Sequence, residues 1–210
     1  SGNHFVEWGI IELNAQNSLN LPEGNYIALL SHSGSRGLGA AIAMHYFEKA
    51  MEVCKLPNMA KHLAWLDMNS QLGQEYWLGM NLAGEYAKAC HDLIHKNMTK
   101  QLGFEPLITI ENHHNFAWKE MYNNEEVIVH RKGATPAGKG VMGIIPGSMT
   151  APGFLVRGKG EENAINSASH GAGRQMSRTK AIKSITKTDM QTILKDHGVT
   201  LIGAGLDEAP

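Results

Sequence analysis

The stretch YIALLSHSGSRGLGAAIAMHYFEKAMEVCK, residues 26–55, contains both a strand-like and a helix-like pattern. Its first part, residues 26–32, is mainly apolar and predicts a strand. The glycine-rich turn GSRGLG at 34–39 follows. Residues 40–55 then carry apolar side chains at helical spacing, which predicts an α-helix that ends before Pro57. A strand is therefore expected to pass into a helix through a glycine turn.

The residues before this stretch predict a partner strand. Residues 4–14 (HFVEWGIIELN) mix β-branched and aromatic side chains in the manner of a strand. Residues 15–25 contain the Asn, Ser, Pro and Gly that are typical of a turn. We therefore expect the strands at 4–14 and 26–32 to form a hairpin or to lie next to each other.

A long helix is predicted over residues 71–100. Its apolar side chains recur at three- and four-residue intervals, which is typical of a side packed into the core rather than of a cofactor site. Cys90 lies on this stripe and is expected to be a buried thiol. The stripe comprises Tyr76, Met80, Ala83, Ala87, Cys90 and Ile94.

The second half of the chain predicts short strands among loops. Residues 107–115 (LITIENHHN) and 125–134 (EEVIVHRKGA) each predict a strand. Residues 133–161 are rich in Gly and Pro with short apolar runs, and they indicate a compact series of strands and loops.

A last helix is predicted over residues 187–197. Thr188 is its expected N-cap, Gln191 stands three residues on in the capping-box position, and Gly198 ends the helix. Strands and helices follow no regular alternation along the chain. The predicted fold class is therefore α+β, with mixed β-sheets and packed helices.

Composition narrows the class of protein. A length of 210 residues makes one domain the default and leaves two small domains possible. The chain is 42% hydrophobic and 19% charged, which is ordinary for a globular protein and argues against disorder. The 19 basic and 20 acidic residues nearly cancel, so a nucleic-acid-binding surface would need local clustering of Lys and Arg. Two cysteines, Cys54 and Cys90, argue against a disulfide framework. The sequence contains neither a signal peptide nor a membrane-spanning stretch, so we expect a cytoplasmic protein.

Four of the 11 histidines stand at the ends of predicted strands or in glycine-rich loops, where sites are commonly built. Three imidazoles that converge from separate segments can hold a divalent transition metal. No pair among the four has the short spacing of a helical metal motif such as His-Glu-x-x-His. A metal site and a set of ordinary histidines therefore both remain open. The four are His4, His32, His114 and His170.

Two glycine-rich loops carry an arginine. In 34–39, Arg36 has a guanidinium suited to a phosphate, and a glycine turn that enters a helix can bind phosphate through its amides. The loop HGAGR at 170–174 joins His170 to Arg174. A histidine that attacks phosphorus would be a nucleophilic catalyst. An ordinary turn is the alternative for each loop.

Basic residues cluster between positions 131 and 183 although the chain as a whole is nearly neutral. Such a cluster can meet a polyanion, and a solvated face balanced by acids elsewhere is the alternative. The cluster comprises Arg131, Lys132, Arg157, Lys159, Arg174, Arg178, Lys180 and Lys183.

Short motifs taken together are more specific than any one of them. The chain resembles the RtcB family of RNA-splicing ligases through motifs that occur in family order over nearly its whole length. They are GNHFVE (2–7), HSGSRGLG (32–39), NHHN (112–115), RKGATPA (131–137), IPGSM (145–149), FLVRG (154–158) and SHGAGRQMSRTKA (169–181). The resemblance implies an RtcB-like fold and one catalytic domain over residues 1–210.

The resemblance also implies an RNA ligase that uses GTP and manganese. Such enzymes join an RNA 3′-phosphate or 2′,3′-cyclic phosphate end to a 5′-hydroxyl end, in tRNA splicing or RNA repair. A histidine attacks the α-phosphorus of GTP, and the resulting histidine-guanylate passes to the RNA 3′-phosphate before the 5′-hydroxyl displaces GMP. Transfer-RNA halves or broken RNAs are the implied RNA partners, and archease is an implied candidate for an activating partner.

Matched motif by motif, His170 corresponds to the guanylated nucleophile. The histidine ligands of two manganese ions correspond to His4, His32 and His114. Glu7 has a carboxylate suited to the N1–H and amino groups of guanine. The implied nucleotide-binding set comprises Asn3, His4, Phe5, Glu7, His114, Asn115, Pro146, Gly147, Ser148, Met149, His170, Ala172 and Gly173. The candidates for phosphate or RNA contacts are Arg36, Lys132, Arg174 and Arg178.

The chain departs from the family pattern at both ends. The Asp-x-Gly-Cys-Gly-Met motif, which supplies an aspartate and a bridging cysteine to the metals, is absent, and Cys54 and Cys90 do not match its context. A C-terminal tail with a guanine-contacting lysine is also missing. Gly153 stands where many members have a nucleotide-contacting serine. We therefore expect this chain alone to be a weak or inactive ligase. A non-catalytic RNA- or nucleotide-binding relative and a metal-dependent phosphoesterase are the alternatives.

Overall fold

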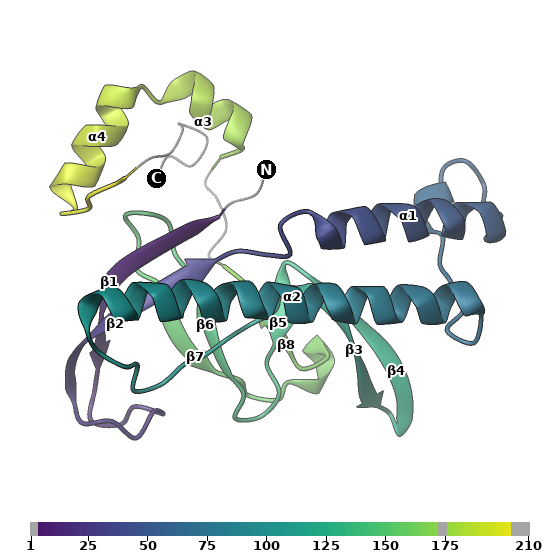
Figure 1. Cartoon of the computed structure of the whole chain (residues 1–210), viewed down its shortest axis with the longest axis horizontal. Helices are drawn as coiled ribbons and strands as arrows, with labels where there is room; N and C mark the ends of the chain where they lie inside the picture. Colours follow the sequence, from purple (N-terminus) through teal and green to yellow (C-terminus); the bar gives the residue numbers. More distant parts are fainter. Residues whose placement is uncertain (1–3, 172–175, 203–210) are drawn as a thin grey trace. The chain divides into compact units, whose positions relative to one another are not determined.

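The computed structural model of the chain describes residues 4–171 and 176–202, with only the backbone of Arg178 (Figure 1). The chain divides into two compact units, Ser1–Leu107 (unit 1) and Ile108–Pro210 (unit 2). Each unit combines helices with antiparallel two-stranded ladders, which confirms the predicted α+β class. That residues 1–210 act as one catalytic domain stays a prediction.

Unit 1 opens with a hairpin. Strands β1 (Phe5–Leu13) and β2 (Gly24–His32) pair antiparallel, from Phe5 opposite His32 to Leu13 opposite Gly24. The Asn17 side chain shapes the connection, because its Oδ1 accepts from the amide of Leu19 at 3.1 Å and its Nδ2 donates to the carbonyl of Leu21 at 2.8 Å. The predicted hairpin is confirmed, and its register brings the two ends that carry His4 and His32 together.

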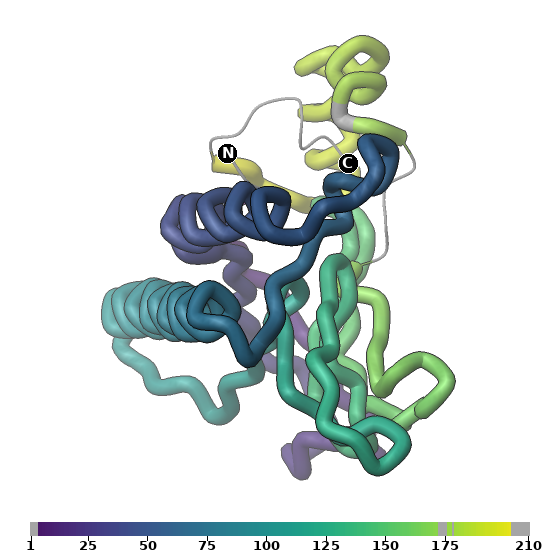
Figure 2. The backbone as a smooth tube through the Cα atoms, turned by 90° about the vertical axis from the view of Figure 1, so that its right-hand side faces the viewer, coloured from purple at the N-terminus to yellow at the C-terminus, as the bar shows by residue number. Residues whose placement is uncertain are grey.

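Two helices complete unit 1. Helices α1 (Leu38–Val53) and α2 (Gln71–Leu102) lie side by side in both views, joined through the short helix η1 (Lys61–Leu63) (Figures 1 and 2). The Ser70 side chain caps α2 by accepting from the amide of Gly73, and Gly103 ends it in the left-handed region at φ 72°. Both predicted helices are confirmed within a few residues.

The inward face of α2 is the predicted apolar stripe, but it is only partly covered. Ala83 is buried and the other five residues of the stripe are half-buried. Cys90 is among them, so the prediction of a buried thiol was wrong. These half-buried side chains therefore keep some contact with solvent. Both cysteines are free thiols.

Unit 2 begins with a second hairpin. Strands β3 (Asn115–Tyr122) and β4 (Glu125–Lys132) are joined by Asn123 and Asn124, whose positive φ values of 51° and 65° are those of a type I′ turn. The strand predicted over 107–115 was wrong, because the strand begins only at Asn115. In the preceding segment the Asn112 side chain, rather than a ladder, holds the chain by accepting from the amide of Ile144 at 2.9 Å.

Two further ladders follow, and three of their four strands lie in the stretch 133–161 that predicted short strands, whereas the fourth lies at 167–169. Strand β5 (Ala134–Pro136) pairs with β8 (Ser167–Ser169), and β6 (Met142–Ile145) pairs with β7 (Phe154–Arg157). The short helix η2 (Glu162–Ala164) precedes β8. The β5–β8 ladder matters for the site because β5 follows Gly133 and β8 leads directly into His170.

Helices α3 (Arg178–Ser184) and α4 (Lys187–Asp196) follow in unit 2, before the last described residues, 197–202. The N-cap of α4 is Thr186 and not the predicted Thr188, and its box partner is Asp189 rather than Gln191. Thr186 Oγ1 accepts from the Asp189 amide at 3.1 Å, and Asp189 Oδ2 accepts from the Thr186 amide at 3.0 Å. The prediction failed because Thr-x-x-Asp, two residues earlier, forms the same box with a stronger acceptor. Gly198, at φ 68°, follows the helix as predicted.

Among the residues that the structure describes, no helix is both long enough and apolar enough to cross a membrane.

Candidate active site

His170 lies immediately after β8 with an exposed side chain. Its ring Nδ1 lies 2.9 Å from the carbonyl oxygen of Gly133. A carbonyl can only accept, so Nδ1 donates, and in the neutral ring the lone pair belongs to Nε2. The geometry therefore assigns the lone pair to Nε2, the atom that could act as a nucleophile or a ligand.

Gly133 links His170 to His114. Its amide donates to the carbonyl of His114 at 2.8 Å, and its carbonyl accepts from His170. The two imidazole rings lie 4.7 Å apart between centroids, at 31° to each other. Gly133 has φ 72°, and a Cβ there would lie 3.6 Å from Cε1 and Nδ1 of the His170 ring. Glycine is favoured here by its backbone conformation rather than by lack of space.

The β3–β4 ladder places two more of the predicted site residues next to His114 and Gly133. Asn115 and Lys132 are cross-strand partners at its last pair, next to His114 and Gly133 in sequence. Both side chains are exposed. Unit 2 thus brings His114, Asn115, Lys132 and His170 together around Gly133, a residue that the sequence analysis did not single out.

The predicted loop 146–149 lies close to His170 at one point. A Cβ on Gly171 would meet the carbonyl oxygen of Pro146 at 3.8 Å. Gly147 is required by packing, because a Cβ there would lie 2.3 Å from the carbonyl oxygen of Ala151. At Gly153 a Cβ would lie 3.2 Å from the carbonyl oxygen of Ile145, so a serine would need a small backbone shift.

Arg131 was predicted to join the basic cluster, and that prediction was wrong. Its side chain is 2% exposed and forms a bidentate ion pair with Glu120, at 2.6 and 2.9 Å. Its Nε also donates to Ser167 Oγ at 2.8 Å, and Nη2 donates to the carbonyl of Ile165 at 3.0 Å. The guanidinium lies 4.9 Å from the centroid of the Trp118 ring. Arg131 thus fastens β8, the strand before His170, to the β3–β4 hairpin.

Unit 1 gathers a second group of predicted residues at the open end of its hairpin. The Phe5 and His32 rings stack with 5.6 Å between centroids. Desolvation lowers the pKa of His4, and electrostatic interactions with Arg36 and His32 lower it further. His4 precedes Phe5, whose cross-strand partner is His32, so the two histidines lie at the same end of the hairpin. A lowered pKa keeps the His4 imidazole neutral, which is the form that a metal requires.

Glu7 lies on β1 two residues after Phe5. Desolvation raises the pKa of its carboxyl although part of the side chain is exposed. A carboxylate that has lost part of its hydration gains more from a ligand's N–H donors.

The glycine turn at 34–39 enters α1 through left-handed residues, Arg36 at φ 54° and Gly37 at φ 101°. Ser35 satisfies the first helical amides, because its carbonyl accepts from Leu38 at 3.1 Å and its Oγ accepts from Gly39 at 2.8 Å. A phosphate at this turn would therefore depend on the exposed guanidinium of Arg36 more than on the amides.

Two histidines of unit 1 were missed. His91 and His95 on α2 both contact Ser31 Oγ, at 2.7 and 2.8 Å. They stand four residues apart in HDLIH (91–95), a spacing that puts both rings on one face of a helix. That spacing was the signal that could have found them.

Some predicted residues lie outside the described residues: Asn3, Ala172, Gly173 and Arg174. Of Arg178 the structure gives the backbone, at the start of α3. Within residues 4–171 and 176–202, no group of three or more His, Cys, Asp or Glu side chains is arranged to hold a metal ion. Each unit by itself supplies only part of the predicted ligand set, His4 and His32 in unit 1 and His114 in unit 2.

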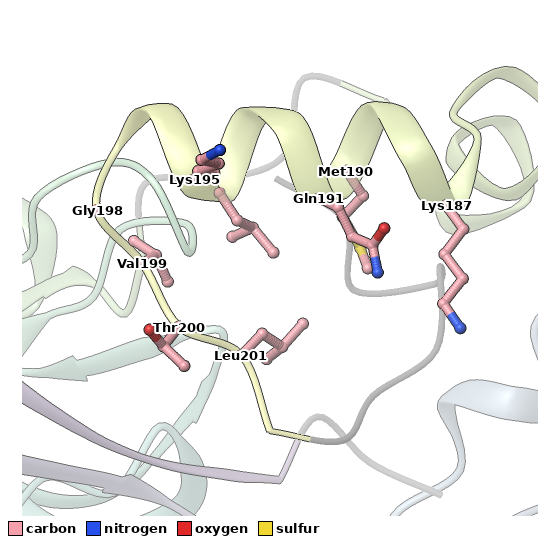
Figure 3. A pocket seen from close by; sticks show the side chains of 9 residues that line it. Lys187, Met190, Gln191, Lys195, Gly198, Val199, Thr200 and Leu201 are labelled. Carbon is pink, nitrogen blue, oxygen red and sulfur yellow. The ribbon is translucent and has the colours of Figure 1, made fainter.

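A pocket of about 550 Å³ lies between α4 and residues 198–201 (Figure 3). Its lining combines apolar side chains such as Met190 and Leu194 with Lys187 and Lys195. None of the predicted site residues lines it.

Fold and site together define an α+β protein with a histidine-centred candidate site. The family model described as "tRNA-splicing ligase RtcB" matches residues 1–209. The chain belongs to this family, as its motifs indicated.

Individual relatives agree with the family model. The chain is 35% identical over 205 residues to the RNA-splicing ligase RtcB of Escherichia coli strain K12, a match that covers 90% of the chain and 47% of the relative. It is 31% identical over 239 residues to the tRNA-splicing ligase RtcB of Methanococcus maripaludis, covering 96% and 49%. The chain therefore spans about half the length of these curated relatives.

Proposed function

We propose that the protein carrying this chain is a GTP- and manganese-dependent RNA ligase. It joins an RNA 3′-phosphate or 2′,3′-cyclic phosphate end to a 5′-hydroxyl end, in tRNA splicing or RNA repair in the cytoplasm. The observation that carries the proposal is the His170–Gly133 hydrogen bond, because it leaves Nε2 of an exposed imidazole free to attack. The names of the relatives, RNA- and tRNA-splicing ligases, support the same chemistry.

The first step forms a histidine-guanylate on His170. Nε2 attacks the α-phosphorus of GTP, a nitrogen–phosphorus bond forms, and the bond to the bridging oxygen breaks as pyrophosphate leaves with its electron pair. The ring becomes cationic as its lone pair enters the new bond. The Gly133 carbonyl, which already accepts from Nδ1, stabilises that charge. Lys132 stands beside this position and offsets phosphate charge.

The guanylate then moves to RNA. The RNA 3′-phosphate attacks the guanylate phosphorus, the nitrogen–phosphorus bond breaks, and the neutral His170 imidazole returns. A 2′,3′-cyclic end is first opened by water to the 3′-phosphate. After guanylate transfer, the RNA 5′-hydroxyl attacks the phosphorus of the guanylated 3′-phosphate, loses its proton and displaces GMP. Arg36, Arg174 and Arg178 are candidates for holding the RNA or phosphate charge.

We propose His4, His32 and His114 as manganese ligands, because imidazole suits divalent first-row metals. When bound, the metal would offset the charge of the triphosphate and of the leaving pyrophosphate. Glu7 would select guanine by accepting from its N1–H and amino groups. The backbone of residues 146–149, with Phe5 and Asn115, completes the proposed nucleotide contacts.

The test is labelling of the full-length protein with α-³²P-GTP and manganese. We expect an acid-labile, base-stable labelled band that His170→Ala abolishes. His197→Ala is the matched control, because His197 also donates Nδ1 to a carbonyl, that of Ile193 at 2.8 Å, but lies at the end of α4. The control should label normally. A folded, manganese-loaded protein that takes no label would favour a non-catalytic RNA- or nucleotide-binding relative. Adding archease to a labelling-competent protein tests that proposed partner.

A further inference from the structure

His91 and His95 project from one face of α2 onto strand β2 in unit 1. Residues four apart on a helix lie one above the other. His91 Nδ1 lies 2.7 Å and His95 Nε2 lies 2.8 Å from the single hydroxyl oxygen of Ser31. All three side chains are half-buried.

The direction of each hydrogen bond in this cluster follows from one backbone carbonyl. His91 Nε2 lies 3.3 Å from the carbonyl oxygen of Ser33, which can only accept, so Nε2 carries the hydrogen. In the neutral ring Nδ1 then accepts the hydroxyl proton of Ser31. Having donated its only proton, Ser31 Oγ accepts from Nε2 of His95. The chain of donation therefore runs from His95 to Ser31, to His91 and to Ser33.

These hydrogen bonds involve the residues on both sides of His32. Ser31 and Ser33 are its two sequence neighbours, and His91 bonds the side chain of one and the backbone of the other. The β1–β2 ladder ends at the pair Phe5–His32, so ladder bonds stop where the contact with Ser33 begins. Helix α2 thus fixes the end of the strand on both sides of a proposed metal ligand.

We propose that His91 is a positioning residue that, through Ser31 and Ser33 and with the support of His95, fixes the orientation of the His32 imidazole. The metal role of His32 rests on the proposed function. The hydrogen bonds of His91 and His95 to Ser31 and of His91 to Ser33, called the clamp below, do not depend on it. Outer groups that orient a metal-binding histidine commonly change metal affinity by 10- to 100-fold.

Variants of the full chain separate the parts of the clamp. Ser31→Ala removes the shared hydroxyl, and Ser31→Thr restores it on a residue that suits a strand. His91→Asn keeps an acceptor near the Nδ1 position but cannot reach Ser33. His91→Phe removes both ring nitrogens. Ser33→Ala is the matched control, because the carbonyl that accepts from His91 stays in place.

Two measurements are made on each variant, with the amide spectrum as the check of folding. The first is ¹³C relaxation of the His32 ring in the metal-free chain, which reports ring order without any activity. The second is the dissociation constant for Mn²⁺ alone, measured by electron paramagnetic resonance. We expect Ser31→Ala and His91→Phe to lower His32 ring order and to weaken Mn²⁺ binding about 10-fold or more. Ser31→Thr and Ser33→Ala should stay close to the parent chain.

An unchanged His32 ring in folded Ser31→Ala and His91→Phe would overturn the proposal. If His91→Phe fails to fold, the comparison of Ser31→Ala with Ser31→Thr decides it in the same way. If ring order falls in the variants but Mn²⁺ binding by the full-length protein that carries the same substitutions does not change, the positioning role of His91 stands and the proposed metal role of His32 fails. The two failures are therefore distinguishable.

Discussion

His170 donates its Nδ1 hydrogen to the carbonyl of Gly133 across 2.9 Å, and this bond assigns the free lone pair to Nε2. We expect the neutral ring to show the Nδ1–H pattern in long-range ¹H–¹⁵N spectra, the tautomer that a free imidazole favours less. His197, which donates Nδ1 to Ile193, should give the same pattern and serves as an internal reference. An Nε2–H pattern at His170 would contradict the orientation.

A change at Gly133 provides the perturbation for this experiment. Gly133→Ala places a side-chain residue at φ 72°, which costs about 1–2 kcal/mol and shifts the carbonyl. Gly103→Ala is the matched control, because Gly103 has the same φ of 72° with no atom within 4 Å of the added Cβ. Both should lose similar stability, and only Gly133→Ala should disturb the His170 tautomer.

How far the sequence predicts this site depends on where each residue lies. Hairpin β1–β2 and helix α2 were predictable because their apolar patterns are long and regular. The cluster around His170 followed from family motifs rather than from spacing. The role of Gly133 could not be predicted, because it depends on a β5–β8 ladder of three pairs whose strands lie far apart in sequence. Arg131 was misassigned because a sequence does not show which of two adjacent basic side chains turns inward.

The Arg131–Glu120 pair should stabilise unit 2 strongly. Arg131→Met leaves the carboxylate without its partner and removes the bonds to Ser167 and Ile165, so we expect a loss of about 3 kcal/mol in the free energy of unfolding. Lys119→Met is the control, since Lys119 contacts Glu126 at 3.7 Å with both side chains largely exposed. Its cost should stay within about 0.5 kcal/mol in the same urea titration. Equal losses in the free energy of unfolding for the two variants would show that the buried Arg131–Glu120 pair stabilises the protein no more than an exposed pair does.

The N-cap of α4 gives a test in which the structure and the sequence pattern disagree. Thr186→Ala removes the acceptor for the Asp189 amide and should destabilise the helix by about 1 kcal/mol. Thr188→Ala, inside the helix, should be neutral or slightly stabilising because alanine is the better helix former. Amide hydrogen exchange over residues 189–193 measures both. A larger loss of protection in Thr188→Ala would restore the capping position first predicted.

Glu7 predicts a pH dependence of stability. Desolvation raises its pKa above the ordinary value of 4.5, so the folded protein holds this proton more tightly than the unfolded chain. The resulting contribution to stability is present below pH 4.5 and is lost as the pH rises through the higher folded pKa. Glu7→Gln stays neutral at every pH. The stability of this variant relative to the parent should therefore be higher at pH 7.5 than at pH 4, when both are unfolded with urea.

Glu12→Gln, at the far end of the same strand, corrects for the removal of one carboxylate from β1. The Glu7 prediction fails if the two variants show the same difference between pH 4 and pH 7.5.

The Asn123–Asn124 turn has a consequence for the order of folding. A two-residue turn lets β3 and β4 pair on the microsecond timescale of isolated hairpins, which sets His114, Asn115 and Lys132 in place early. His170 meets Gly133 only after 37 residues have been closed into a loop, a contact that carries a larger entropic cost. In a chain emerging from the ribosome, we therefore expect His170, the proposed nucleophile, to be the last member of the unit 2 cluster to reach its place.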